Sequence, residues 1–120
     1  MHTAVLDVFP ETAALTPAGH LAIGGCDTVE LAQRLGTPLY VFDEATLRSM
    51  CRAFAGEFGR RYPQSQVLYA CKAYLNPALA RIFQEEGLGL DVVSAGEMAI
   101  ARAAGPRESI LLHVEQDGGE

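Results

Sequence analysis

Two kinds of hydrophobic pattern alternate along the chain between residues 43 and 114. In the first kind, apolar residues recur every three or four positions, which predicts a helix with one apolar face. The clearest set is Leu47, Met50, Cys51, Phe54 and Phe58. In the second kind, short runs rich in β-branched and aromatic residues predict strands. These runs occupy residues 66–74, 88–94 and 109–114. The alternation predicts three helix–strand pairs in succession.

Helix start and stop signals separate the predicted strands. Asn76 and Pro77 form an N-cap followed by a proline at the first helical position. Ser94 and Glu97 form a capping box, which is a signal for a second helix start. A glycine follows each of these helices and ends it. Strands that are joined through helices run parallel, and their apolar residues fit strands that are buried on both faces.

The number of predicted strands bounds the fold class. Three parallel strands leave open edges and too small a core for a finished domain. An eight-stranded β/α barrel needs about 250 residues, and the chain has 120. We therefore expect an α/β fold that forms the first part of a larger barrel.

The pattern before residue 43 is weaker. Residues 1–18 contain two prolines and little periodicity, which predicts a loose lead-in. Residues 19–25 predict a short strand, and Asp27 predicts the capped start of a helix that ends at Gly36. The run "PLYVFD" at residues 38–43 predicts a further strand.

Composition and charge exclude several classes of function. Hydrophobic residues make up 49% of the chain and charged residues 20%, which is a globular composition. The net charge is −6 and no basic patch is present, so we expect no nucleic-acid partner. No apolar run approaches the roughly 20 residues of a membrane span, and we see no signal peptide. The scattered cysteines Cys26, Cys51 and Cys71 fit a reduced, cytoplasmic protein without a metal site.

Lys72 stands out because it lies within the apolar run "VLYACKAY". A buried ammonium is costly unless it is paired or neutralised. One interpretation places Lys72 at the end of the strand, with its stem packed and its charged head in water. The other places it at the carboxyl end of a barrel strand, where active sites gather and where desolvation would favour a neutral, nucleophilic amine. Periodicity alone leaves both interpretations open.

A wider stretch then carries a resemblance to a known family. "LYACKA", followed by a helix and by "GLGLDVVSAGE", resembles the lysine region of the fold-type III pyridoxal-phosphate decarboxylases. The earlier stretch "GTPLYVFD" is similar to the entry segment of the same family. These linked blocks cover about residues 19–113, and within the group they are most similar to the diaminopimelate decarboxylases.

The resemblance implies a fold, a cofactor and a site. The fold would be the N-terminal part of an alanine-racemase-like (β/α)8 barrel, in which Lys72 holds pyridoxal 5'-phosphate covalently and acts as the catalytic amine. Asp91 is then expected beside the cofactor and Lys72, although it also fits a strand-end carboxylate that caps a turn. His113 could face the cofactor or be a structural histidine. Ser94 and Glu97 fit a helix cap better than a catalytic role.

The resemblance also implies a domain plan and a reaction. Residues 1–42 would pair with a separate C-terminal β-domain, residues 43–114 would form the first α/β units of the barrel, and residues 115–120 are a polar tail unlike the family. The reaction would be decarboxylation of meso-2,6-diaminopimelate to L-lysine by a homodimer. Alternatives are decarboxylation of ornithine, arginine or carboxylated polyamines, and a non-catalytic or degenerate member of the family.

The likeness stops at Val114, and a frameshift or an artificial end is one hypothesis for this break. Genomic sequence across that codon would test it. Several of the family's substrate-binding and cofactor-binding parts would lie beyond residue 120. We therefore expect the 120-residue chain by itself to be inactive and to aggregate.

Overall fold

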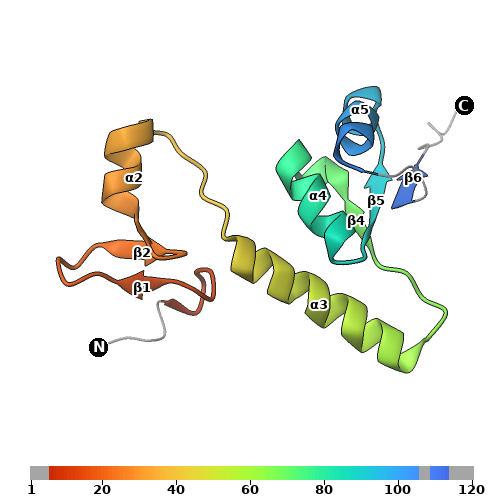
Figure 1. Cartoon of the computed structure of the whole chain (residues 1–120), viewed down its shortest axis with the longest axis horizontal. Helices are drawn as coiled ribbons and strands as arrows, with labels where there is room; N and C mark the ends of the chain where they lie inside the picture. The colour runs from red at the N-terminus through yellow and green to blue at the C-terminus, as the bar shows by residue number, and fades with distance from the viewer. Residues whose placement is uncertain (1–5, 106–108, 114–120) are drawn as a thin grey trace, which may run out of the picture. The chain divides into compact units, whose positions relative to one another are not determined.

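The computed structural model describes residues 6–105 and 109–113, so the predicted tail at 115–120 lies outside the described residues (Figure 1). The chain divides into two compact units, Met1–Ser49 and Met50–Glu120. The predicted pairing of residues 1–42 with a β-domain stays a prediction.

The first unit contains a small antiparallel sheet and a helix. The sheet has the strand order β1 (Ala14–Leu15), β2 (Leu21–Ile23) and β3 (Cys26–Asp27). The helix α2 (Thr28–Leu35) follows directly, as the capping signal predicts. The short strand predicted at residues 19–25 is confirmed as β2, whereas β1 lies in the stretch that was expected to be loose.

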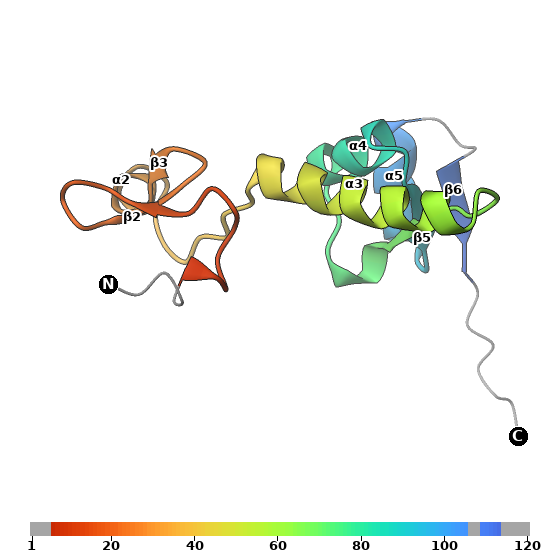
Figure 2. The same cartoon turned by 90° about the horizontal axis from the view of Figure 1, so that it is seen from below.

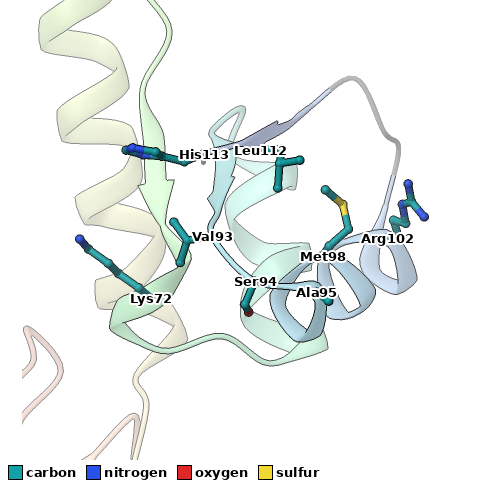
Figure 3. A pocket seen from close by; sticks show the side chains of 8 residues that line it. All are labelled: Lys72, Val93, Ser94, Ala95, Met98, Arg102, Leu112 and His113. Carbon is teal, nitrogen blue, oxygen red and sulfur yellow. The ribbon is translucent and has the colours of Figure 1, made fainter. Parts of the chain in front are cut away.

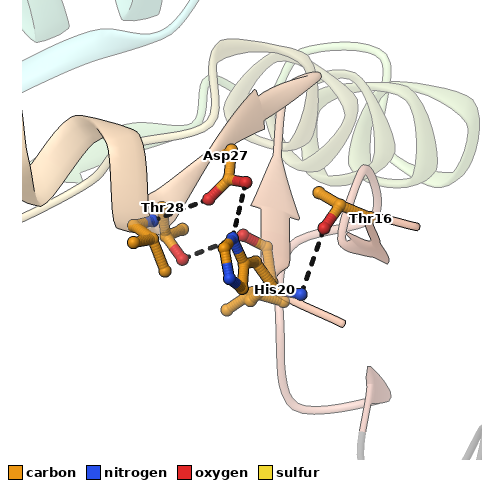
Figure 4. A network of polar contacts seen from close by, with 6 residues as sticks. Thr16, His20, Asp27 and Thr28 are labelled. Atoms are coloured by element: carbon orange, nitrogen blue, oxygen red, sulfur yellow. Dashed lines mark hydrogen bonds and ion pairs between the residues drawn. The ribbon is translucent and has the colours of Figure 1, made fainter. Parts of the chain in front are cut away.

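A polar network joins the sheet of this unit to the start of α2 (Figure 4). The Nδ1 atom of His20 lies 2.8 Å from Oδ2 of Asp27, and this hydrogen bond holds the pKa of the Asp27 carboxyl below its usual value. The other Asp27 oxygen caps the helix by accepting a backbone N–H of its first turn. The His20 backbone N–H donates to the Thr16 hydroxyl, and the Thr28 hydroxyl donates to a β2 carbonyl. The network therefore fixes both ends of the β2–β3 hairpin to the helix.

The prediction of a strand at residues 38–43 is wrong. These residues form neither strand nor helix, and the side chain of Tyr40 is 90% exposed. The sequence has the composition of a strand, but a strand also needs a neighbour to accept its hydrogen bonds, and no described strand pairs with this segment. Asp43 ends the segment and caps the next helix through hydrogen bonds from the Thr46 backbone and hydroxyl, which lower the pKa of the Asp43 carboxyl.

The second unit is built on a parallel sheet with the strand order β4 (Leu68–Ala70), β5 (Gly89–Val92) and β6 (Ile110–Leu112). The helix α4 (Pro77–Glu85) connects β4 to β5, and α5 (Ala95–Ala104) connects β5 to β6. This order confirms the predicted alternation of helices and parallel strands.

The helices cover one face of this sheet, and the other face stays open. Leu90 and Val92 of β5 are fully buried because α4 and α5 pack on their side of the sheet (Figure 1). The same core includes Leu79, Ala80, Phe83 and Ala101. On the opposite face Leu68 is 38% exposed and Leu111 is 50% exposed. Side chains alternate between faces along a strand, so Leu90 and Val92 are buried under the helices while Leu68 and Leu111 are partly exposed on the other face.

The helix α3 (Glu44–Arg61) precedes the sheet, and one ion pair joins it to the end of α4 (Figure 2). The Arg52 guanidinium donates to both carboxylate oxygens of Glu86, at 2.7 Å and 2.9 Å. Glu86 is the C-cap of α4 and its side chain is 9% exposed. A bidentate arginine–carboxylate pair holds one orientation better than a single contact does, so it fixes α3 against the end of α4.

Both ends of α4 follow the sequence signals. The Asn76 side chain accepts the backbone N–H of Leu79 at 2.9 Å, which confirms the predicted N-cap. At the other end the Leu88 N–H donates to the Phe83 carbonyl, and the Gly87 N–H donates to a carbonyl one residue further on. Gly87 has a φ of +82°, a left-handed conformation in which a side chain is strained. This pair of bonds is a Schellman motif and turns the chain directly into β5.

The strand around Lys72 is shorter than predicted. Its pairing with β5 ends at Ala70, and residues Cys71–Ala73 form a 3-10 helix, η1. The chain has to reverse before α4 begins at Pro77, and the turn starts at once after the last paired residue. Lys72 therefore lies beyond the strand, in a turn that belongs to its carboxyl end.

Candidate functional site

The register of the parallel sheet brings the predicted site residues to the same edge. Ala70 pairs with Asp91, and Asp91 pairs with Leu111, so these residues form one row across the sheet. Lys72 follows two residues after Ala70, and His113 follows two residues after Leu111. All of the predicted site residues lie at or just beyond the carboxyl ends of the strands. In α/β barrels this is the edge at which active sites form.

A cavity of about 780 Å³ lies at this edge. Figure 3 shows the Lys72 and His113 side chains extending to the same side of the sheet, with Val93 between them. The cavity continues past β6, where Leu112 and Met98 face each other between the strand and α5. Its remaining lining comes from Ser94, Ala95 and Arg102. The cavity is thus polar where the strands end and apolar along the edge of β6.

The Lys72 side chain is exposed in the η1 turn. Among the described residues it has no carboxylate partner and no hydrogen bond, so its amine is open to the cavity. The turn below it is anchored by Cys71, whose side chain is 2% exposed and points into the core.

Asp91 is the only one of these groups that carries an unsatisfied buried atom. Its Oδ2 lies 3.6 Å from Nδ1 of His113, and its side chain is 25% exposed. Its Oδ1 is buried and accepts no hydrogen bond from any described residue. A buried acceptor without a donor costs free energy. Asp91 is not among the residues that line the cavity, but its partner His113 is, so the carboxylate contacts the cavity wall through the histidine.

Ser94 and Glu97 form the helix cap that the sequence predicts. The Ser94 hydroxyl accepts the Glu97 backbone N–H at 3.1 Å and donates to the Glu97 carboxylate at 2.8 Å. The same carboxylate reaches back to the Val93 backbone N–H at 3.4 Å. The N-terminus of α5 is thereby held at the edge of the cavity, and neither side chain needs a catalytic role to explain its position.

Sequence reasoning did not identify two lining residues, Met98 and Arg102. They follow Ser94 at intervals of four residues, so they lie on one side of α5. This spacing could have been used as a signal. The N-cap Ser94 lies next to the strand ends, so residues four and eight positions later on α5 are expected on the same side of the helix. Within the described ranges 6–105 and 109–113, no group of histidine, cysteine, aspartate and glutamate side chains could hold a metal ion.

The fold and this edge define a class of protein before any comparison is made. A parallel β–α–β–α–β array with an open lysine, a carboxylate and a histidine at the carboxyl ends of its strands fits an α/β-barrel enzyme whose lysine amine can act as a nucleophile. The family described as "Pyridoxal-dependent decarboxylase, pyridoxal binding domain" matches residues 44–116. The chain belongs to this family.

Individual relatives agree with the family. The chain is 47% identical over 106 residues to the diaminopimelate decarboxylase of Bacillus methanolicus, covering 88% of the chain and 24% of the relative. It is 49% identical over 98 residues to that of Methanothermobacter thermautotrophicus, covering 82% and 23%. The crystal structure of diaminopimelate decarboxylase from M. jannaschi matches with a TM-score of 0.71 and 32% identity, over 87% of this chain and 25% of that chain.

These comparisons confirm three predictions. The fold is the N-terminal part of an alanine-racemase-like barrel, the family is that of the fold-type III decarboxylases, and its cofactor is pyridoxal phosphate. The chain spans about a quarter of the length of the curated relatives it matches. No helix in the described part of the chain is long and apolar enough to cross a membrane.

Proposed function

We propose that this chain forms the cofactor-binding start of a pyridoxal-phosphate-dependent decarboxylase, and that the whole enzyme converts meso-2,6-diaminopimelate to L-lysine and carbon dioxide. Family membership supports the class of chemistry. The name shared by the relatives at 47% and 49% identity supports the substrate. The proposal further takes the enzyme to be a cytoplasmic homodimer that acts on a small amino acid.

A single observation supports the site most strongly. The open amine of Lys72 and the side chain of His113 line one cavity at the carboxyl ends of the strands, and the Asp91 carboxylate lies 3.6 Å from His113. The amine supplies the nucleophile that a cofactor aldehyde requires. The Asp91 carboxylate places a negative charge beside His113 at the same edge of the sheet, which suits a site that holds a protonated amine. The residues present therefore fit pyridoxal phosphate.

Each residue has a separate task in this proposal. Lys72 would hold the cofactor through Nζ, and the same atom would hold or return a proton during the reaction. Asp91 supplies the negative charge that opposes the positive charges of the site. His113, 3.6 Å from Asp91, forms one wall of the cavity and orients that carboxylate.

The cofactor supplies the remaining chemistry when it is bound, because its ring accepts the electron pair that the departing carbon dioxide leaves behind. The cavity walls restrict how a substrate can lie. Val93 and Leu112 are apolar and exclude water from one side, while Lys72 and His113 leave the other side polar. This arrangement favours one orientation of a substrate carboxylate at the strand ends.

Covalent trapping tests the proposal. The protein, expressed from its own gene, is incubated with pyridoxal phosphate, reduced with borohydride and digested, and the labelled peptide is identified by mass spectrometry. We expect the label on Lys72 and none in the Lys72→Ala variant. Arg81→Ala, which removes a different basic side chain, is the control and should label normally. Label on another residue, or no label, would overturn the assignment of the site.

Release of carbon dioxide then separates the substrates. We expect turnover of meso-2,6-diaminopimelate to exceed that of ornithine and arginine by at least about tenfold, because a site built to pair a polar substrate group rejects analogues that lack it. A protein that labels on Lys72 but prefers ornithine or arginine would retain the class of chemistry and lose the proposed substrate.

A further inference from the structure

We infer that Tyr69 is a positioning residue for Lys72, because its hydroxyl closes the turn that carries the lysine. This inference rests on the proposed function of Lys72. It concerns how the exposed Lys72 side chain, which has no hydrogen bond to a described residue, is directed toward the cavity.

Tyr69 is held rigidly from below. It lies in the middle of β4, and its ring stacks on the ring of Phe83 from α4, with 4.0 Å between the ring centroids and 27° between the planes. Phe83 is 4% exposed, so it belongs to the core. A side chain that stacks on a core residue has few alternative rotamers. The Tyr69 hydroxyl is therefore presented at a fixed place.

The hydroxyl reaches across the turn. It donates a hydrogen bond of 2.7 Å to the backbone carbonyl of Tyr74, five residues further along the chain. The η1 turn lies between these two residues and contains Lys72 at its centre. The bond thus joins the two ends of the segment whose middle residue would hold the cofactor. Burial raises the pKa of the Tyr69 hydroxyl, so it remains a donor at neutral pH.

A second anchor acts on the same turn. The Cys71 side chain is 2% exposed and fixes the first residue of η1 in the core. Its thiol also lies 3.7 Å from the Tyr69 carbonyl. With Cys71 held on one side and Tyr74 held on the other, the Lys72 backbone has little freedom. The side chain still has four rotatable bonds, so the turn determines where the amine can reach.

The consequence is a defined role for a hydroxyl that touches neither substrate nor cofactor. Without the hydrogen bond from the Tyr69 hydroxyl, the η1 turn would sample more conformations. The amine would then spend less time where a cofactor aldehyde can react. A net gain or loss of one such hydrogen bond corresponds to about a two- to tenfold change in an equilibrium.

The variant Tyr69→Phe isolates the hydroxyl because it preserves the ring that stacks on Phe83. Its matched control is Tyr62→Phe, which removes the hydroxyl of a 66% exposed tyrosine in the same unit and leaves the turn around Lys72 untouched. Both variants are made in the protein as expressed from its own gene. Thermal unfolding is measured first, and we expect both midpoints to lie close to that of the unsubstituted protein.

Two measurements then distinguish a positioning role from a structural one. In the cofactor-free protein, hydrogen exchange of the backbone amides at residues 71–75 should be about two- to tenfold faster in Tyr69→Phe, with no change elsewhere in the sheet. The rate constant for attachment of pyridoxal phosphate to Lys72 should fall by a similar factor. Tyr62→Phe should change neither quantity.

Each failure has its own signature. If the unsubstituted protein takes no label on Lys72, the proposed function is wrong. If it does, and Tyr69→Phe shows the same local exchange and the same attachment rate, the role of Tyr69 is overturned alone. Faster exchange throughout the sheet with a lowered unfolding midpoint would also overturn it, since that result would show a general loss of stability.

Discussion

Two neighbouring residues of the η1 turn differ in exposure and in reactivity. Lys72 is exposed to the cavity, whereas Cys71 is buried in the core. Burial raises the pKa of the Cys71 thiol to about 11, and the negative charges of Glu97 and Asp91 add to the shift. A thiol with this pKa is protonated at neutral pH and is a poor nucleophile. The turn therefore offers one reactive group to the cavity, the amine.

This division gives a prediction for thiol reactivity. At pH 8 we expect a disulfide reagent such as 5,5'-dithiobis(2-nitrobenzoate) to modify Cys26, which is exposed, within seconds to minutes, while Cys71 and the buried Cys51 react only after unfolding in urea. Peptide mapping identifies the modified cysteines before and after unfolding. Rapid modification of Cys71 in the folded protein at pH 8 would contradict the buried position.

Asp91 is the second residue whose chemistry can be tested. The variant Asp91→Asn retains the size of the side chain and removes its charge. Hydrogen bonds that involve a charged group contribute about 1.5–3 kcal/mol, so we expect pyridoxal phosphate to dissociate roughly 10- to 100-fold more readily. Equilibrium dialysis followed by absorbance measures the retained cofactor. Glu30→Gln removes a carboxylate of α2 in the other unit and is the control; equal loss in both variants would contradict a specific role for Asp91.

At the scale of elements, the Schellman motif after α4 sets where β5 begins. Gly87→Ala places a side chain at a φ of +82°, which costs about 1–2 kcal/mol. Gly59→Ala is the matched control, because Gly59 lies inside α3 and a Cβ there meets nothing within 4 Å. Alanine in a helix interior is favoured over glycine by roughly 0.5–1 kcal/mol. Urea unfolding should therefore move the midpoint down for Gly87→Ala and up for Gly59→Ala, and shifts in the same direction would contradict this explanation.

The elements that the sequence predicted correctly are those with local causes. The caps at Asn76 and Ser94 and the turn at Gly87 each form within a few residues. Their signals can therefore be read from the sequence alone. The strand predicted at residues 38–43 failed because strand formation depends on a partner that the sequence does not name. The length of β4 failed for a related reason, since its end is set by the register with β5.

The site shows the same limit. Lys72 stood out because a lysine within an apolar run is visible in the sequence, whereas the site roles of Lys72, Asp91 and His113 came from the family resemblance and stay predictions. The stacking of Tyr69 on Phe83 and its bond across the turn were not visible, since both join residues from different elements or span a 3-10 turn that was read as strand. A sequence shows which groups are present, whereas the contacts that aim them require the fold.

At the scale of the whole molecule, the second unit leaves apolar surface without a cover. Leu68 and Leu111 are exposed on the sheet face that carries no helix, and β4 and β6 are the edge strands of the described sheet. Open edges and exposed apolar faces promote association between chains. The α3 side chains Met50, Phe54 and Phe58 add further exposed apolar surface to this unit.

We therefore expect the 120-residue chain to self-associate at micromolar concentrations, with a sedimentation coefficient that rises with concentration. The double variant Leu68→Gln with Leu111→Gln should reduce this rise, because it makes the open face polar without touching the core under the helices. Leu35→Gln is the control, since Leu35 is a 66% exposed leucine on α2 of the other unit. A monomer at all concentrations would show that the open face has no tendency to associate. An equal effect of the control would show that association depends on exposed leucines in general, and only a selective effect of the double variant identifies the open sheet face as the associating surface.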